Sequence, residues 1–93
     1  MRKFKKMTSC RLPYNRQGLI YFTCQDYRRQ PEEVRKKIRD ISKAVSGGDD
    51  MKRRAIFALM TTEISWTECC MRYYVSDSTL DRMRKRFYEQ WRD

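Results

Sequence analysis

The sequence contains no histidine at all. Histidine is the commonest general base, the usual partner of a serine or cysteine nucleophile, and a frequent ligand of catalytic zinc. Only three glycines are present, and the pair Gly47-Gly48 lacks the lysine that follows the glycines of a phosphate-binding loop. We therefore expect a protein that is not an enzyme, with no catalytic residues and no cofactor.

Long apolar stretches are missing as well. No run approaches the roughly 18 apolar residues that a membrane-spanning helix needs, and the basic start MRKFKKMTSC has no apolar segment after it, as a signal peptide would. We therefore expect a cytoplasmic protein that makes no membrane contact. Its four cysteines are then expected to stay reduced.

The cysteines Cys10, Cys24, Cys69 and Cys70 contain no CxxC pair. Adjacent residues on a helix point about 100° apart, so Cys69 and Cys70 make a poor chelate on their own. A metal site would have to recruit Cys10 and Cys24 from distant segments, and a redox pair is the other alternative. We expect instead that Cys69 packs in the core and that Cys70 fills a close helix crossing, with no metal site.

Positive charge is what the sequence has in excess. Twenty-two Lys and Arg stand against twelve Asp and Glu, giving a net charge of +10. The excess is clustered, because residues 1–30 carry +7, residues 31–50 carry 0 and residues 51–93 carry +3. A clustered excess of this size favours a polyanionic partner, and double-stranded DNA is the partner we expect.

Apolar spacing predicts an all-α fold. Residues 1–17 form a basic flexible arm in this interpretation, and residues 18–93 form the helical domain. Residues 18–30 have a strand-like composition but helical spacing, and we favour a short helix that ends before Pro31. A helix over 31–46 carries the apolar stripe Val34, Ile38, Ile41 and Val45. This amphipathic helix is the dimer surface that we favour, and the alternative is that it only completes the core.

Another helix is expected after a cap at Asp49 or Asp50, and two more close the chain. Ser65 and Glu68 have capping-box spacing before a helix that runs to about Tyr74, and Ser76 is a second N-cap candidate. The helix 77–91 follows, with an apolar stripe of Leu80, Met83, Phe87 and Trp91. A short helix, a three-residue break and a longer basic helix outline a helix-turn-helix at about 65–91.

The segment TECCMRYYVSDSTLDRMRKRF resembles the helix-turn-helix of sigma-factor region 4 and of phage regulators of the RinA and ArpU type. The span from QGLIYFTCQDYRRQPEEVRKKI onward also resembles short proteins of Gram-positive mobile elements. Tyr74 departs from the pattern, because this position commonly holds a left-handed glycine. A non-glycine residue there costs about 1–2 kcal/mol. We therefore expect either a wider turn or one more helical residue.

This resemblance implies a transcriptional regulator of a phage or mobile element, with helix 77–91 in the major groove. The expected base contacts are Asp77, Ser78, Asp81, Arg82 and Lys85. The expected phosphate contacts are Lys52, Arg53, Arg54, Arg72, Thr79, Arg84 and Arg86.

Three alternatives stay open at this point. The chain could be a protein-interaction module that docks on RNA polymerase or a phage enzyme, or a DNA-architecture factor for excision or packaging. Aromatic stacking on single-stranded bases is the third, and Tyr74 and Tyr88 are the residues expected to be exposed for it. For the regulator we expect a homodimer on a two-fold site.

Overall fold

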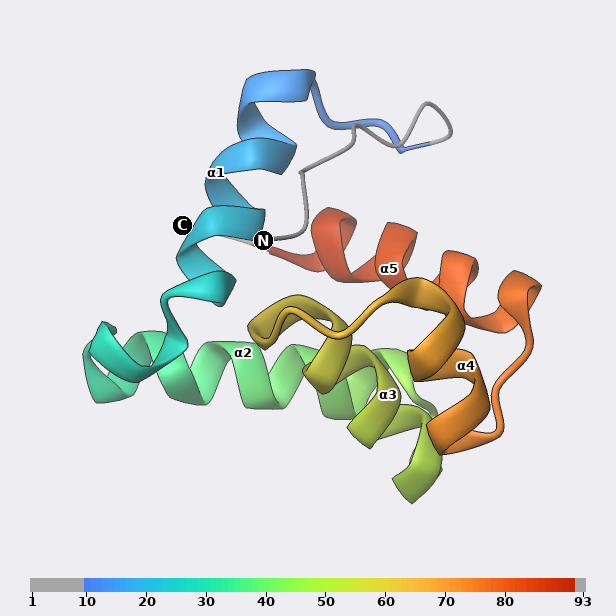
Figure 1. The fold of residues 1–93 in the computed structure, drawn as a ribbon. Coiled ribbons are helices and arrows are strands. Elements are labelled where there is room, and N and C mark those ends of the chain that lie inside the picture. The colour runs from blue at the N-terminus through green and yellow to red at the C-terminus, as the bar shows by residue number, and fades with distance from the viewer. Residues whose placement is uncertain (1–9, 92–93) are drawn as a thin grey trace.

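The computed structural model describes residues 10–91, and every regular element in this range is a helix (Figure 1). The predicted all-α fold class is therefore confirmed for this part of the chain. None of these helices is long and apolar enough to cross a membrane. In chain order the elements are α1 (Tyr14–Gln25), the 3-10 turn η1 (Tyr27–Arg29), α2 (Glu32–Val45), α3 (Asp50–Thr61), α4 (Trp66–Tyr73) and α5 (Asp77–Gln90).

The helix favoured for residues 18–30 is present, but it begins earlier than expected. Pro13 precedes the first turn of α1, and its carbonyl accepts a hydrogen bond from the backbone N–H of Gln17 at 3.0 Å. The side chain of Gln17 is fully buried and donates to the carbonyl of Leu12 at 2.8 Å. Residues 10–17 therefore belong to the folded domain, and the expected boundary at 17 is wrong. The rest of the predicted arm, residues 1–9, lies outside the described residues.

The ends of α2 and α3 follow the local signals in the sequence. Gln30 is extended before Pro31, as expected of a residue that precedes proline. Gly47 and Gly48 both have positive φ, 64° and 88°, and they end α2. Asp49 then caps α3, because its carboxylate accepts a hydrogen bond from the backbone N–H of Lys52 at 2.9 Å.

The core is built around α3, which contacts all four of the other α-helices. Ala55, Ile56, Ala58, Leu59 and Met60 of this helix are all buried. A helix that is apolar on most of its circumference belongs in the centre of a helical domain. In Figure 1 α1 lies at one side of the molecule and α4 with the start of α5 at the other.

The apolar stripe of α2 is part of this core. Ile38, Ile41 and Val45 are buried, and Val34 packs against the same cluster while partly exposed. The stripe is thus covered by the chain's own helices. The stripe therefore forms one wall of the core and is not available as a dimer surface.

Tyr88 is buried, although the sequence suggested that it is exposed. The segment before α1 supplies the physical reason. Its backbone N–H at Arg11 donates to the carboxylate of Glu89 at 3.3 Å, so this segment lies along the C-terminal part of α5. Cys10 from the segment and Tyr88 from α5 join one core cluster. Tyr74 is exposed as expected, at 86%.

Candidate nucleic-acid interface

Hydroxyl caps start both of the last two helices. Ser65 Oγ accepts from the backbone N–H of Glu68 at 3.1 Å, and Ser76 Oγ accepts from the backbone N–H of Thr79 at 3.2 Å. Each bond satisfies one of the donors that a helix start leaves without a partner. Both serine caps are therefore confirmed, whereas the Glu68 carboxylate of the expected capping box pairs with Arg72. The helices α4 and α5 are separated by three residues, as expected.

The turn between α4 and α5 depends on Tyr74. Its φ of 56° and ψ of 45° are left-handed, so neither the wider turn nor the extra helical residue that we expected occurs. The N–H groups of Tyr74 and Val75 both donate to the carbonyl of Cys70. Val75 is buried in the core, and a packed apolar residue commonly follows a left-handed helix end. These contacts hold the strained residue in place.

Trp66 ties the start of α4 to α5. Its indole Nε1 donates to Asp77 Oδ1 at 2.9 Å, and the Arg84 guanidinium lies over its ring at 4.9 Å from the centroid. Cys70 Sγ also donates to Asp77 Oδ1, at 3.5 Å. Arg84 in turn forms an ion pair with Asp81 at 3.7 Å. The two aspartates expected at DNA bases therefore have partners within the domain, and so does Arg84, which was expected at a phosphate.

The remaining candidates for base contact lie on the outer face of α5. Ser78 and Arg82 are exposed and Lys85 is half-exposed, whereas the stripe of Leu80, Met83 and Phe87 is buried. Helical geometry thus brings three of the five predicted base-contacting residues onto one accessible surface.

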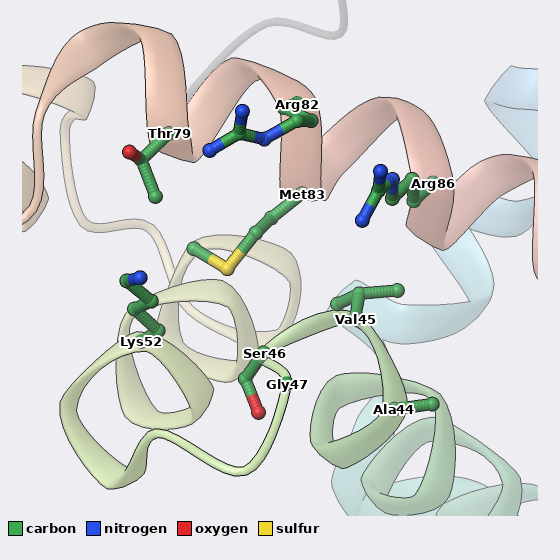
Figure 2. A pocket seen from close by; sticks show the side chains of 9 residues that line it. All are labelled: Ala44, Val45, Ser46, Gly47, Lys52, Thr79, Arg82, Met83 and Arg86. Carbon is green, nitrogen blue, oxygen red and sulfur yellow. The ribbon is translucent and has the colours of Figure 1, made fainter.

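Four predicted residues meet around a single groove of about 320 Å³, which we call the cationic groove (Figure 2). It lies between α5 and the connection from α2 to α3. Within residues 10–91, none of its three cations forms an ion pair. No carboxylate from this range lines it either. The lining residues are Ala44, Val45, Ser46, Gly47, Lys52, Thr79, Arg82, Met83 and Arg86.

The other predicted phosphate contacts have acidic partners. Arg53 and Arg54 both pair with Asp50, at 2.6 Å and 3.0 Å. Arg72 pairs with Glu68 one turn earlier on α4. These pairs are exposed and hence weak, so they compete with a phosphate without excluding it. Asp50 has its pKa lowered chiefly by its hydrogen bond from Arg53.

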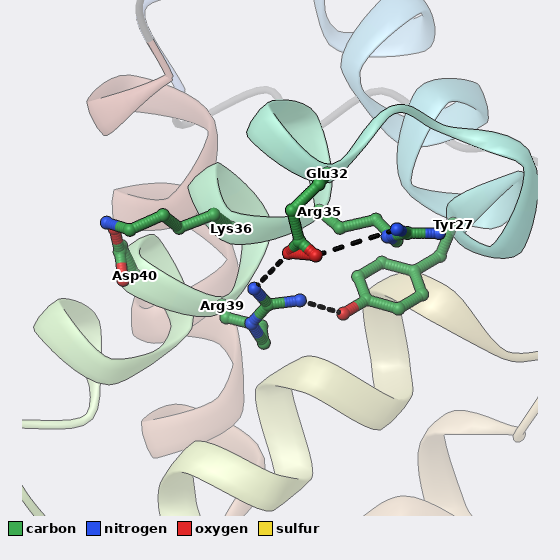
Figure 3. Close-up of polar contacts among 6 residues, drawn as sticks. All are labelled: Tyr27, Glu32, Arg35, Lys36, Arg39 and Asp40. Carbon is green, nitrogen blue, oxygen red and sulfur yellow. Dashed lines mark hydrogen bonds and ion pairs between the residues drawn. The ribbon is translucent and has the colours of Figure 1, made fainter.

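Three cations of α2, Arg35, Lys36 and Arg39, also stand in ion pairs (Figure 3). Arg39 donates to Glu32 at 2.5 Å and to the hydroxyl of Tyr27 at 2.8 Å, and Lys36 pairs with Asp40 at 2.8 Å. The Arg39 hydrogen bond is the main cause of a lowered pKa at Glu32. Arg39 therefore joins η1 to α2. Unlike the cations of the groove, it has an acidic partner within the domain.

The cysteines serve the packing. Cys69 is fully buried and its Sγ donates to the Ala55 carbonyl of α3 at 3.3 Å. Cys70 is half-buried between α4 and the start of α5. Burial raises the pKa of the Cys24 thiol from 9.0 to about 12. In the part of the chain that the structure describes, no three Cys, Asp or Glu side chains gather to hold a metal ion.

Sequence patterns alone did not reveal the groove. Lys52 stands 27 positions before Thr79 in the sequence, and only the packing of α5 against α2 and α3 brings them together. Ser46 and Gly47 were seen only as a helix end, and they form part of the groove wall. The role of Trp66 was also missed, although its position next to the Ser65 cap was visible.

No protein-family model matches this sequence, and no curated protein and no solved structure is significantly similar to it.

Proposed function

We propose that this chain is a double-stranded DNA-binding protein in which α4, the turn and α5 act as a helix-turn-helix. In this proposal α5 lies in the major groove and α4 braces it from behind. The 14 residues of α5 span about 21 Å, and a groove about 12 Å wide admits one helix. The Trp66–Asp77 hydrogen bond supports the proposal, because it fixes the start of α5 relative to α4.

The cationic groove is the observation that carries the proposal. It gathers Lys52, Arg82 and Arg86 beside α5, and none of the acidic side chains that the structure describes lines it. Elsewhere on the described surface, most cations of α2, α3 and α4 stand in ion pairs that neutralise them in part, namely Arg35, Lys36, Arg39, Arg53, Arg54 and Arg72. Uncompensated positive charge on one face is the electrostatic footprint of a polyanion-binding protein.

The residues divide by role. Ser78 and Lys85 carry base contacts from the outer face of α5, whereas Lys52 and Arg86 bind backbone phosphates from the groove. Asp77 and Asp81 position α5 through Trp66 and Arg84.

The resemblance to sigma-factor region 4 and to RinA- and ArpU-type regulators supports a transcriptional regulator of a phage or mobile element. A DNA-architecture factor for excision or packaging is the alternative within the same chemistry. Sequence dependence separates the two, because a regulator prefers one motif and an architectural factor binds most duplexes alike.

The proposal is tested by fluorescence anisotropy on a random-sequence duplex between about 50 and 200 mM salt. The double variant Lys52→Gln/Arg86→Gln removes two groove cations. It should weaken binding by about tenfold or more and reduce the salt slope by about two. The matched control, Arg28→Gln/Lys36→Gln, removes the same charge from residues that do not line the groove. Equal losses in both variants would contradict the assignment of the interface.

A second candidate function, a protein-interaction module, is favoured by one observation on α1. Leu19 and Phe22 lie one turn apart and are 59% and 56% exposed. Exposed apolar pairs of this kind suit a protein partner. A second copy of the chain would fit the homodimer expected of a regulator, and RNA polymerase or a phage enzyme would fit the module.

A further inference from the structure

The exposed surface of α5 is divided into two strips. Ser78, Asp81 and Lys85 do not line the cationic groove, and we call them the outer strip, whereas Thr79, Arg82 and Arg86 line the groove. Figure 2 shows the side chains of Arg82 and Arg86 on the groove side of the helix, above Val45 and opposite Lys52. Arg82 was expected at a base edge, yet it lines the same hollow as the phosphate candidates.

Charge makes the groove a site for an anion. The nearest carboxylates of the α2–α3 connection are engaged elsewhere, because Asp49 caps α3 through the Lys52 backbone N–H and Asp50 pairs with Arg53 and Arg54. The three like charges around the groove repel one another, and a bound anion relieves this repulsion. Met83, which is buried, also lines the groove and adds an apolar surface beside the cations.

A hydroxyl donor is also available in the groove. Ser76 Oγ donates to Thr79 Oγ1 at 2.9 Å, which leaves the hydroxyl hydrogen of Thr79 free to donate in turn. A volume of about 320 Å³ is at the lower end of the roughly 300–1,000 Å³ typical of ligand pockets. That size suits one sugar–phosphate unit.

We propose that the cationic groove binds one phosphodiester group of the DNA backbone and that Arg82 is a ligand of this phosphate, not a base contact. The inference rests on the proposed function. It leaves the outer strip, with Ser78 and Lys85, to face the bases, while Arg82 sets the register of α5 without specifying sequence.

The experiment compares the chain with Arg82→Gln and the matched control Arg28→Gln, on a selected duplex and on its single-base-pair variants, at several salt concentrations. Arg82→Gln should weaken binding to every duplex by the same factor, about tenfold, and lower the salt slope by about 0.9. The penalty for each base-pair change should stay the same. Arg82→Lys, which keeps the charge but loses the bidentate fork, should recover most of the affinity. Circular dichroism checks that each variant is folded.

Two outcomes would overturn the inference and leave DNA binding intact. Loss of preference at one base pair in both Arg82 variants would make Arg82 a base contact. Displacement of the duplex by pyrophosphate, at concentrations where sulfate of equal ionic strength has no effect, would make the groove a site for a free phosphate compound. Absence of duplex binding by the unmodified chain at low salt is a different result, because it removes the proposed function itself.

Discussion

Trp66 Nε1 donates a hydrogen bond to Asp77 Oδ1 at 2.9 Å, and this bond joins the first residue of α4 to the first residue of α5. The same carboxylate oxygen accepts from Cys70 Sγ at 3.5 Å. Asp77 also sits in the first turn of α5, where a negative charge is stabilised by the helix dipole. One carboxylate thus sets the relative position of the two helices on which the proposed function depends.

Replacing Trp66 with Phe keeps an aromatic ring under Arg84 and removes the indole donor. We expect the free energy of unfolding to fall by about 1 kcal/mol, because a hydrogen bond to a charged acceptor is lost at a half-buried site. Urea unfolding followed by circular dichroism measures the change. Tyr74→Phe, which alters an exposed aromatic residue of the same region, is the control, and equal stability of the two variants would argue against the Trp66–Asp77 bond.

Tyr74 is strained by its left-handed backbone, with φ of 56°. We predict that Tyr74→Gly is more stable than Tyr74→Ala by about 1 kcal/mol, because only alanine keeps the β-carbon that disfavours this conformation. Both variants lose the tyrosine side chain, which is 86% exposed, so this loss does not contribute to the difference between them. An alanine variant as stable as the glycine variant in urea unfolding would show that the turn is not left-handed in solution.

Burial raises the pKa of the Cys24 thiol from 9.0 to about 12. The unfolded chain therefore loses this proton at lower pH than the folded chain, and stability falls as pH rises through the interval from 9.0 to about 12. The decline reaches about 1.4 kcal/mol for each pH unit inside that interval. Because other groups titrate there too, the test is the difference in slope between the chain and Cys24→Ala in urea unfolding. Parallel slopes would mean that the thiol is not buried.

Glu32 is expected to affect the stability of the protein at low pH, whereas Cys24 affects it at high pH. The hydrogen bond from Arg39 lowers its pKa below the ordinary 4.5, so its contribution to stability is present above that value and is lost as pH falls through the lowered pKa. Glu32→Gln should therefore destabilise the protein at neutral pH and lose this effect in acid. Glu33→Gln removes the same charge from the same helical turn and is the control. An effect of Glu32→Gln that persists unchanged in acid would contradict the Arg39 contact.

The exposed apolar pair on α1 gives a prediction about assembly. If α1 forms the homodimer interface, Phe22→Ser should shift the chain to monomer in analytical ultracentrifugation, because the interface loses its larger aromatic side chain. Met71→Ser removes another exposed apolar side chain, on α4, and should leave the oligomeric state unchanged. A chain that is monomeric before any substitution would rule out this interface.

Local signals explain which parts of the fold were predictable. The cap at Ser76 and the stripe of Leu80, Met83 and Phe87 depend on residues a few positions apart, so spacing alone located α5 to within one residue. The Cys69 position was predicted for the same reason. Each of these features belongs to a single helix or its ends.

Tertiary contacts explain what was missed. Tyr88 is buried because the segment before α1 folds back along α5, and no periodicity within 77–91 reports that contact. Gln17 is buried in α1, which packs against α3, so residues before position 18 also belong to the domain. The position of Arg82 likewise depends on where the α2–α3 connection lies relative to α5.

The central claim is that α5 binds double-stranded DNA and prefers one sequence. It is tested most directly by incubating the chain with a random duplex pool at about 50, 100 and 200 mM salt and sequencing the retained fraction. The proposed function predicts retention that falls steeply with salt and a single enriched motif, which Lys85→Gln should weaken. Retention with no enriched motif would favour an architectural factor. Failure to retain any duplex at the lowest salt would contradict DNA binding.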